Sequence, residues 1–291
     1  MKAGILNLDK PCGMTSHDVV NVIRRITDIR RVGHAGALDP MATGVLLVCV
    51  GRATRLSEYL TSSDKRYQAT ARLGVETDTY DAEGDVVNTN PVQISREDVE
   101  TILHRFSGSI SQVPPMYSAI KQGGQPLYKL ARRGIEVERE PRPVRVSHIE
   151  LTQWSPPEFS FDVACSAGTY IRSLAHDLGR ELGCGAHLTR LVRVQSGDFH
   201  LRDSLSLSEL TSGNWQEYIQ PMDRAVADFP LLTLDPSAVQ DLVHGRSISR
   251  RPEHPVSDLA RAYTHDNRFI ALVRSSEDAA HWLPHKVFGG Q

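Results

Sequence analysis

The chain has 291 residues and a mass of 32.3 kDa, with 40% hydrophobic and 23% charged residues. This length allows one large core or two unequal domains, and the composition is that of a globular protein rather than a membrane protein. No apolar run approaches the roughly 20 residues that a bilayer span needs. The N-terminus has no continuous apolar stretch before Asp9 and does not resemble a signal peptide, so we expect a cytoplasmic location.

The formal net charge is −2, so any affinity for nucleic acid has to come from local charge. Residues 121–145 carry seven basic and three acidic side chains, a balance of +4, and residues 24–31 carry four arginines and one aspartate, a balance of +3. Two basic patches on a nearly neutral protein suit a polyanion, and a solvated surface is the alternative. The four cysteines include no CxxC pair, which indicates neither a zinc site nor a disulfide framework.

The first elements can be predicted from the spacing of apolar residues. Residues 4–8 predict a short strand, and Ser16 is expected to cap a helix whose apolar face holds Val19, Val20, Ile23 and Ile26. Residues 31–44 contain three glycines and a proline and have no period, which predicts a long loop before a strand at 45–50. A long loop held between apolar elements is usually functional.

Further along, residues 55–60 predict a helix and the alternation at 66–73 predicts a strand with Tyr67 on one face. Ser95 and Asp98 approximate a capping box that opens a helix. A turn at 122–126 is followed by a short basic helix from Leu127.

Strands are expected at about 142–152 and 159–165, and then a helix capped by Thr169 with an apolar face that includes Ile171 and Leu174. Beyond residue 230, short segments of strand or turn character predict a small β-rich appendage. Because strands outnumber helices and are often neighbours in sequence, the fold class is α+β, with a mixed, largely antiparallel sheet and flanking helices.

Asp39 is the first candidate for chemistry. Proline holds the residue before it extended, and the glycines at 33, 36 and 44 allow a ligand to approach the backbone closely. Such an aspartate could act as a nucleophile or a base. An Asp-Pro pair also commonly starts a turn, so a structural role is the alternative.

Three further side chains could assist Asp39. Arg172, in the first turn of its helix, could keep a carboxylate ionised, or it could be a surface arginine. Tyr67 could stack on a nucleobase or simply fill the sheet. His34 could stack or act as a wedge, and no second ligand at metal spacing accompanies it. Motifs for nucleoside triphosphates, dinucleotides and zinc hydrolysis are absent from the sequence.

The segments GILNLDKPCGMTSHDVV (4–20) and RRVGHAGALDPMATGVLLVCVGRATR (30–55) resemble the first two signature motifs of the TruB family of tRNA pseudouridine-55 synthases. The resemblance continues through KRYQATARLG (65–74), TDTYDAEG (77–84), VPPMYSAIKQGGQPLYKLARRG (113–134), CSAGTYIRSLAHDLG (165–179) and GAHLTRLVRVQSG (185–197). It covers most of residues 4–200.

This resemblance implies roles for the matching positions. Asp39 would be the catalytic aspartate, Arg172 its ion-pair partner and Tyr67 the residue stacked on the target uracil. The remaining implied substrate contacts are Leu191 in the pocket wall, His34 in the space left by the flipped base, Tyr170, and Asp81 near the flipped nucleotides. Lys10 and Pro11 would brace the catalytic loop, and Lys129, Arg132 and Arg133 would belong to an RNA clamp at 121–145.

The resemblance also implies the wider organisation. A pseudouridine synthase domain would span residues 1–229, and a small PUA-like RNA-binding domain would span 230–291. The substrate would be the T arm of tRNA. As an isomerisation, the reaction would need no cofactor and no metal. A monomer with no obligatory protein partner and no membrane association is expected.

Three other functions remain as alternatives. The first is a catalytically idle RNA-binding or tRNA-folding protein on the same scaffold, for which Asp39, Tyr67 and Arg172 would not be required. The second is a guide-RNA-dependent synthase of the related archaeal and eukaryotic branch, although the chain ends without a run of lysines. The third is a glycosidase, although no second carboxylate lies in a comparable loop.

Overall fold

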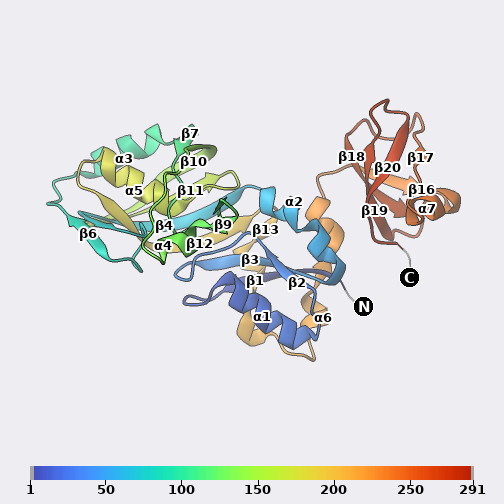
Figure 1. Cartoon of the computed structure of the whole chain (residues 1–291), viewed down its shortest axis with the longest axis horizontal. Helices are drawn as coiled ribbons and strands as arrows, with labels where there is room; N and C mark the ends of the chain where they lie inside the picture. The colour runs from blue at the N-terminus through green and yellow to red at the C-terminus, as the bar shows by residue number, and fades with distance from the viewer. Residues whose placement is uncertain (1–2, 290–291) are drawn as a thin grey trace.

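The computed structural model describes residues 3–289, and most of its strands belong to two sheets of eleven and five strands (Figure 1). The main path of the large sheet runs in the order β14 (Leu205–Ser206), β1 (Gly4–Lys10), β3 (Thr43–Val50), β12 (Ala186–Ser196), β4 (Lys65–Leu73), β11 (Glu158–Cys165), β10 (Arg142–Ser155) and β7 (Gly108–Gln112). Three further strands join it beside this path: β2 (Val32–Ala35) on β3, β13 (Phe199–His200) on β12 and β15 (Gln220–Pro221) on β1.

Most neighbouring strands of the large sheet are antiparallel, as the sequence predicted. Its parallel pairs are β1 with β14 and β3 with β12. The contact between β3 and β12 is short, because only Thr43 and Gly44 pair there, with Val192 and Arg193. This short contact joins the two halves of the sheet.

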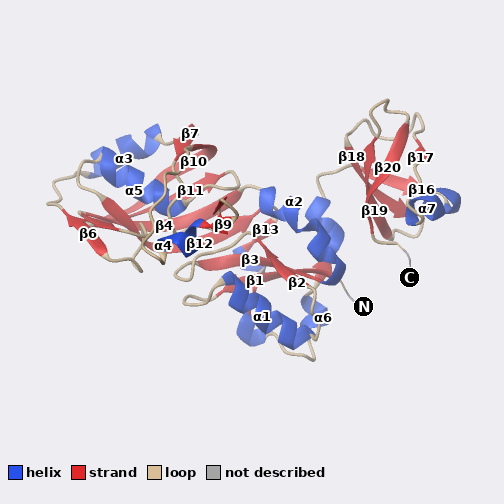
Figure 2. Cartoon of the chain, in the orientation of Figure 1, coloured by secondary structure: helices blue, strands red, loops and turns tan. Residues whose placement is uncertain are grey.

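Helices flank the strands (Figure 2). They are α1 (Ser16–Thr27), α2 (Ser57–Ser62), α3 (Arg96–Arg105), α4 (Leu127–Ala131), α5 (Ile171–Glu181), α6 (Trp215–Tyr218) and α7 (Pro236–Val243), with 3-10 turns η1 (Gly51–Leu56), η2 (Leu201–Asp203), η3 (Leu207–Glu209) and η4 (Met222–Val226). Two small hairpins complete this part, β5 (Val75–Thr77) with β6 (Val86–Thr89), and β8 (Lys121–Gln122) with β9 (Gln125–Pro126).

The large core follows from simple periodicities. On β4, residues 65, 67, 69, 71 and 73 are buried, while 66, 68 and 72 are exposed. The inward face of this strand meets α5, and α3 packs on β10, which lies beyond β11 in the same sheet. On α1, Val19, Val20 and Ile23 recur at helical spacing and are buried in the same cluster. Burial of these apolar stripes therefore holds the helices on the sheet.

Several predicted boundaries are wrong. The expected loop at 31–44 is shorter, because Val32–Ala35 pairs with β3 as strand β2. The cap of α1 is Thr15, which shares a capping box with Asp18, rather than Ser16. The cap of α5 is Tyr170 rather than Thr169. All three differences have the same cause. Hydrogen bonds decide where a helix or strand begins, and the spacing of apolar residues does not show them.

The five-stranded sheet has the order β16 (Leu231–Leu234), β18 (Leu259–Thr264), β19 (Phe269–Ser275), β20 (His281–Val287) and β17 (Ile248–Ser249). The sequence predicted a β-rich region here but missed α7 and β20. The signal for α7 was present, because Asp235 caps the helix by accepting from Ala238 N and Pro236 is its first residue. This sheet lies beyond α2 in Figure 1 and meets the rest of the chain through a cluster that includes Leu56, Val226 and Phe288.

Candidate active site

Asp39 lies in the loop between β2 and β3, which enters the large sheet at the short contact between β3 and β12. The loop is held on α1 because Ser16 Oγ lies 2.8 Å from Leu38 N and 3.1 Å from Leu38 O. At its far end, Gly44 has φ of 99°, and a Cβ there would lie 2.3 Å from the Arg193 carbonyl oxygen. Only glycine fits this approach, so the loop is led into β3 along one path.

Arg172 joins Asp39 to the rest of the site. Its Nη2 donates to Asp39 Oδ1 at 2.9 Å and to Tyr117 O at 2.8 Å, and its Nη1 donates to Thr79 O at 3.2 Å. Asp81 Oδ2 lies 3.4 Å from the same Nη1. The buried guanidinium thus lies between two carboxylates.

The two carboxylates differ in access. The Asp81 side chain is buried, and its Oδ1 accepts from Thr79 Oγ1 at 2.6 Å and from Glu83 N at 3.0 Å. The Asp39 side chain is 34% exposed. Burial raises the pKa of Asp39, and the positive charge of Arg172 opposes this shift. Asp39 is therefore the carboxylate that a substrate can reach.

Lys10 holds the loop that carries Asp39 against the end of β1. Its fully buried side chain donates through Nζ to Pro11 O at 2.8 Å, Met14 O at 2.6 Å and Pro40 O at 3.2 Å. Burial lowers the pKa of Lys10. Pro11 takes part through its carbonyl oxygen, and Pro40 directly follows Asp39, so Lys10 ties the first strand to the aspartate.

Arg193 is a second brace, which the sequence analysis did not single out. This buried side chain donates to Val45 O at 2.7 Å, Gly36 O at 3.1 Å and Ala37 O at 3.3 Å. It therefore holds both ends of the loop that carries Asp39. A signal was present, because Arg193 is a charged residue among the apolar residues of LVRV, and a buried charge has to find partners.

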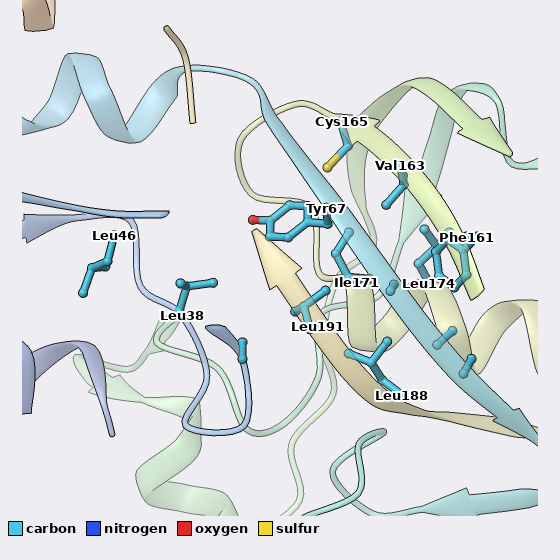
Figure 3. Packing of buried hydrophobic residues seen from close by; sticks show 14 of the residues in the cluster. Leu38, Leu46, Tyr67, Phe161, Val163, Cys165, Ile171, Leu174, Leu188 and Leu191 are labelled. Atoms are coloured by element: carbon cyan, nitrogen blue, oxygen red, sulfur yellow. The ribbon is translucent and has the colours of Figure 1, made fainter. Parts of the chain in front are cut away.

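An apolar wall adjoins these polar groups. Tyr67 on β4, Leu191 on β12 and Ile171 on α5 are buried in one cluster, and Figure 3 shows the Tyr67 ring with Leu191 and Ile171 beside it. Burial raises the pKa of Tyr67, so its hydroxyl stays neutral. The ring therefore offers an uncharged aromatic surface.

Tyr170 stands at the start of the helix that carries Arg172. Gln112 fixes its backbone in both directions, donating to Tyr170 O at 3.0 Å and accepting from Tyr170 N at 2.8 Å. The structure therefore places Tyr170 where it sets the first turn of α5, and its half-buried ring borders the site.

His34 lies on β2, where it pairs with Val48, and no hydrogen bond joins it to Asp39 among the described residues. Burial and the nearby Arg193 lower its pKa, which favours a neutral ring. Lys129 on α4, and Arg132 and Arg133 just after it, are exposed. Their segment is linked to the site because Tyr117, whose carbonyl accepts from Arg172, lies just before it.

No group of three or more His, Cys, Asp and Glu side chains that could hold a metal ion occurs within residues 3–289. None of the helices described is long and apolar enough to cross a membrane.

The fold and the site define a class of enzyme, the pseudouridine synthases. A family model described as "TruB family pseudouridylate synthase (N terminal domain)" matches residues 24–171, and another described as "tRNA pseudouridylate synthase B C-terminal domain" matches residues 172–227. The chain therefore belongs to the TruB family of pseudouridylate synthases, enzymes that isomerise uridine to pseudouridine.

Relatives of similar length support this assignment. A protein of Stutzerimonas stutzeri (strain A1501) named "tRNA pseudouridine synthase B" is 44% identical over 283 residues, which is 95% of this chain and 92% of that protein. One of the same name from Clostridium kluyveri is 45% identical over 272 residues, covering 92% of this chain and 94% of the relative.

Among solved structures, a "Cbf5-Nop10-Gar1 Complex" matches with a TM-score of 0.74 and 31% identity, covering 98% of this chain and 85% of the matched one. A chain of an "H/ACA RNP bound to a substrate RNA containing 2'-deoxyuridine" matches with a TM-score of 0.73 and 28% identity, covering 99% of this chain and 85% of the matched one.

Proposed function

We propose that the chain is a bacterial, stand-alone tRNA pseudouridine-55 synthase that acts in the cytoplasm on the uridine at position 55, in the T-arm loop. The observation that carries this proposal is the Asp39–Arg172 pair, in which a buried arginine holds an aspartate that stays open to a substrate. The relatives at 44–45% identity bear the name of a tRNA enzyme, which supports tRNA as the substrate class.

The chemistry rearranges one nucleoside. The bond between N1 of uracil and C1′ of ribose breaks, the uracil turns, and a bond forms between its C5 and C1′. The proton on C5 is lost to solvent and N1 gains a proton, so the atoms and electrons balance without a cofactor. Asp39 can act by attacking the ribose, by adding to the base or by removing a ribose proton. All three routes use the anion, and Arg172 favours it electrostatically.

The target uridine has to leave its stack to reach Asp39, which costs a few kcal/mol. We infer that the uracil then lies against Tyr67, with Leu191 closing the apolar wall, while His34 occupies the vacated space. A neutral ring suits a stacking role for His34. Tyr170 borders the bound nucleotides, and the buried Asp81 lies near them behind Arg172 without contacting them. The apolar side chains of Tyr67 and Leu191 exclude water from the reaction intermediate.

Affinity for the rest of the T arm is assigned to two regions. The basic segment 121–145 acts as a clamp through Lys129, Arg132 and Arg133, whose exposed side chains can pair with phosphates. Residues 230–291 form a small PUA-like RNA-binding domain, and residues 1–229 form the catalytic domain. We propose that the enzyme works as a monomer without an obligatory protein partner or guide RNA.

Tritium release tests this proposal. Purified protein, without metal, nucleotide or guide RNA, is incubated with an unmodified tRNA transcript whose uridines carry tritium at C5. We expect release of the tritium of a single uridine per tRNA. Release should vanish with Asp39→Asn and with a transcript that has cytidine at the T-loop position.

The two controls separate the alternatives. If tRNA binds tightly but no tritium is released, the chain is a binding protein or needs a partner. If the cytidine transcript still releases tritium, another uridine is the substrate. If Asp39→Asn remains active, another residue carries the chemistry.

A further inference from the structure

The turn at Thr79–Asp81 holds the buried guanidinium of Arg172. Thr79 O accepts from Arg172 Nη1 at 3.2 Å, and Asp81 Oδ2 lies 3.4 Å from the same nitrogen. Because the other nitrogen donates to Asp39, the position of this turn sets where Arg172 points. A shift of the turn would therefore move Arg172 relative to Asp39.

Tyr80, between these two contacts, has an unusual backbone. Its φ is 65°, in the left-handed region that residues other than glycine rarely adopt. Its carbonyl accepts from Leu188 N at 3.0 Å, which ties the turn to β12. A strained residue persists only where its surroundings hold it, and such residues cluster at functional sites.

The Tyr80 side chain supplies a second anchor. Its ring stacks on the His176 ring with centroids 4.0 Å apart and an interplanar angle of 12°. His176 follows Arg172 by four residues on α5, so both side chains lie on one face of the helix, a turn apart. The stack therefore clamps the turn to the same helix that carries Arg172.

The edge of the His176 ring is also contacted, because Glu76 Oε1 on β5 lies 3.7 Å from Nδ1. Burial lowers the pKa of His176, which favours a neutral ring. The ring is thus held between the strand that enters the turn and the tyrosine within the turn.

We propose that Tyr80 and His176 are positioning residues for the isomerisation: their ring stack fixes the Thr79–Asp81 turn, and through it the orientation of Arg172 toward Asp39. The proposal rests on the catalytic role proposed above for Asp39. Neither ring has to touch the substrate, because each acts through the arginine.

Loosening the stack has an electrostatic consequence. The charged groups near Asp39 are Arg172 from α5, Asp81 and Glu83 from the turn and the residues after it, and Lys10 from β1. Arg172 and Lys10 favour the anion, and Asp81 disfavours it. If Arg172 moves away from Asp39, the anion loses its nearest cation and the pKa of Asp39 rises. The acid limb of the pH profile of kcat therefore moves to higher pH.

Two variants remove the stack by different routes. Tyr80→Asn keeps a residue that tolerates the left-handed backbone but deletes the ring, and His176→Leu leaves the turn untouched. We expect kcat for tRNA to fall about 10- to 100-fold in each, with KM within about twofold. The acid limb should move to higher pH, and the double variant should lose little more than either single one, because both break one contact.

Conservative variants provide the rescue. Tyr80→Phe and His176→Phe keep two stacked rings and should restore kcat and the acid limb. Val99→Ala is a matched control for general destabilisation, because Val99 is a buried residue of α3 and its truncation opens a cavity in the core without removing either stacked ring. It should lower the melting temperature without moving the acid limb.

The proposal is overturned if Tyr80→Asn and His176→Leu lower only the melting temperature, as Val99→Ala does, or if the phenylalanine variants fail to rescue. Should Tyr80→Asn not fold, His176→Leu decides alone. Asp39→Asn is assayed alongside. Activity in that variant would refute the role of Asp39 itself, whereas its loss together with unchanged kcat in both ring variants would refute only the positioning role.

Discussion

Arg172 and Asp39 are 133 residues apart in the chain and form an ion pair of 2.9 Å in which the arginine side chain is 4% exposed and the aspartate side chain 34%. The guanidinium of Arg172 is buried, while the carboxylate of Asp39 stays accessible to a substrate. This asymmetry lets the pair be preorganised before the substrate binds, because the arginine is fixed by the backbone oxygens of Thr79 and Tyr117.

The pH profile of Arg172→Met tests this relationship. Burial raises the pKa of Asp39 and Arg172 opposes the rise, so removing the cation should raise it further. The active anion is present above this pKa and is lost as the pH falls through it. The acid limb of kcat should therefore move to higher pH, and kcat at neutral pH should fall about tenfold or more. An acid limb that stays in place in the folded variant would contradict this view of Arg172.

Gly44→Ala should damage the loop that carries Asp39. A Cβ at Gly44 would overlap the Arg193 carbonyl oxygen, and φ is positive there, so we expect a loss of about 2 kcal/mol or more in the free energy of unfolding, together with a lower kcat. Gly13→Ala is the matched control, since its φ of +82° is also positive but nothing lies within 4 Å of the added Cβ. Urea unfolding and tritium release measure both effects. Equal losses in the two variants would mean that the contact with Arg193 is unimportant.

Neutralising the clamp should affect binding rather than chemistry. The triple change of Lys129, Arg132 and Arg133 to glutamine should weaken tRNA affinity. It should lower the slope of log Kd against log salt concentration by up to about 3, while kcat at saturating tRNA stays the same. A charge-matched control replaces the exposed Arg96, Arg105 and Arg202, which lie outside segment 121–145. An unchanged salt slope in the first triple variant would rule out the clamp.

The five-stranded sheet should lose stability in acid through His254. Its Nδ1 accepts from Arg251 N at 3.1 Å and from Trp282 Nε1 at 3.3 Å, so the ring has to be neutral. Burial lowers its pKa below the ordinary 6.5, so the unfolded state takes up the proton first. This contribution to stability is complete above about pH 6.5 and declines as the pH falls from there to the folded pKa. The thermal midpoint should fall less steeply between pH 7 and 5 in His254→Gln than in the unaltered protein, and parallel curves would exclude His254.

Much of the local structure was predictable because it depends on neighbours in the chain. Val19, Val20 and Ile23 recur at helical spacing, and Tyr67 lies on the inward face of an alternating strand. Ser95 and Asp98 form the predicted capping box. The glycines and the Asp-Pro pair marked the loop around Asp39 as unusual. The α7 helix had such a local signal too, in Asp235 and Pro236, but was missed.

The sequence by itself thus determined many of the elements, the α+β class and, through its motifs, the family. The resemblance implied that Arg172 pairs with Asp39, and the structure shows the contact. Only the tertiary structure decided that Arg193 meets the loop at Gly36 and that Tyr80 meets His176. The reason is physical. Helical and strand periods are set within a few residues, whereas these contacts depend on the register of β12 against β3 and β4 and on where α5 packs on the sheet.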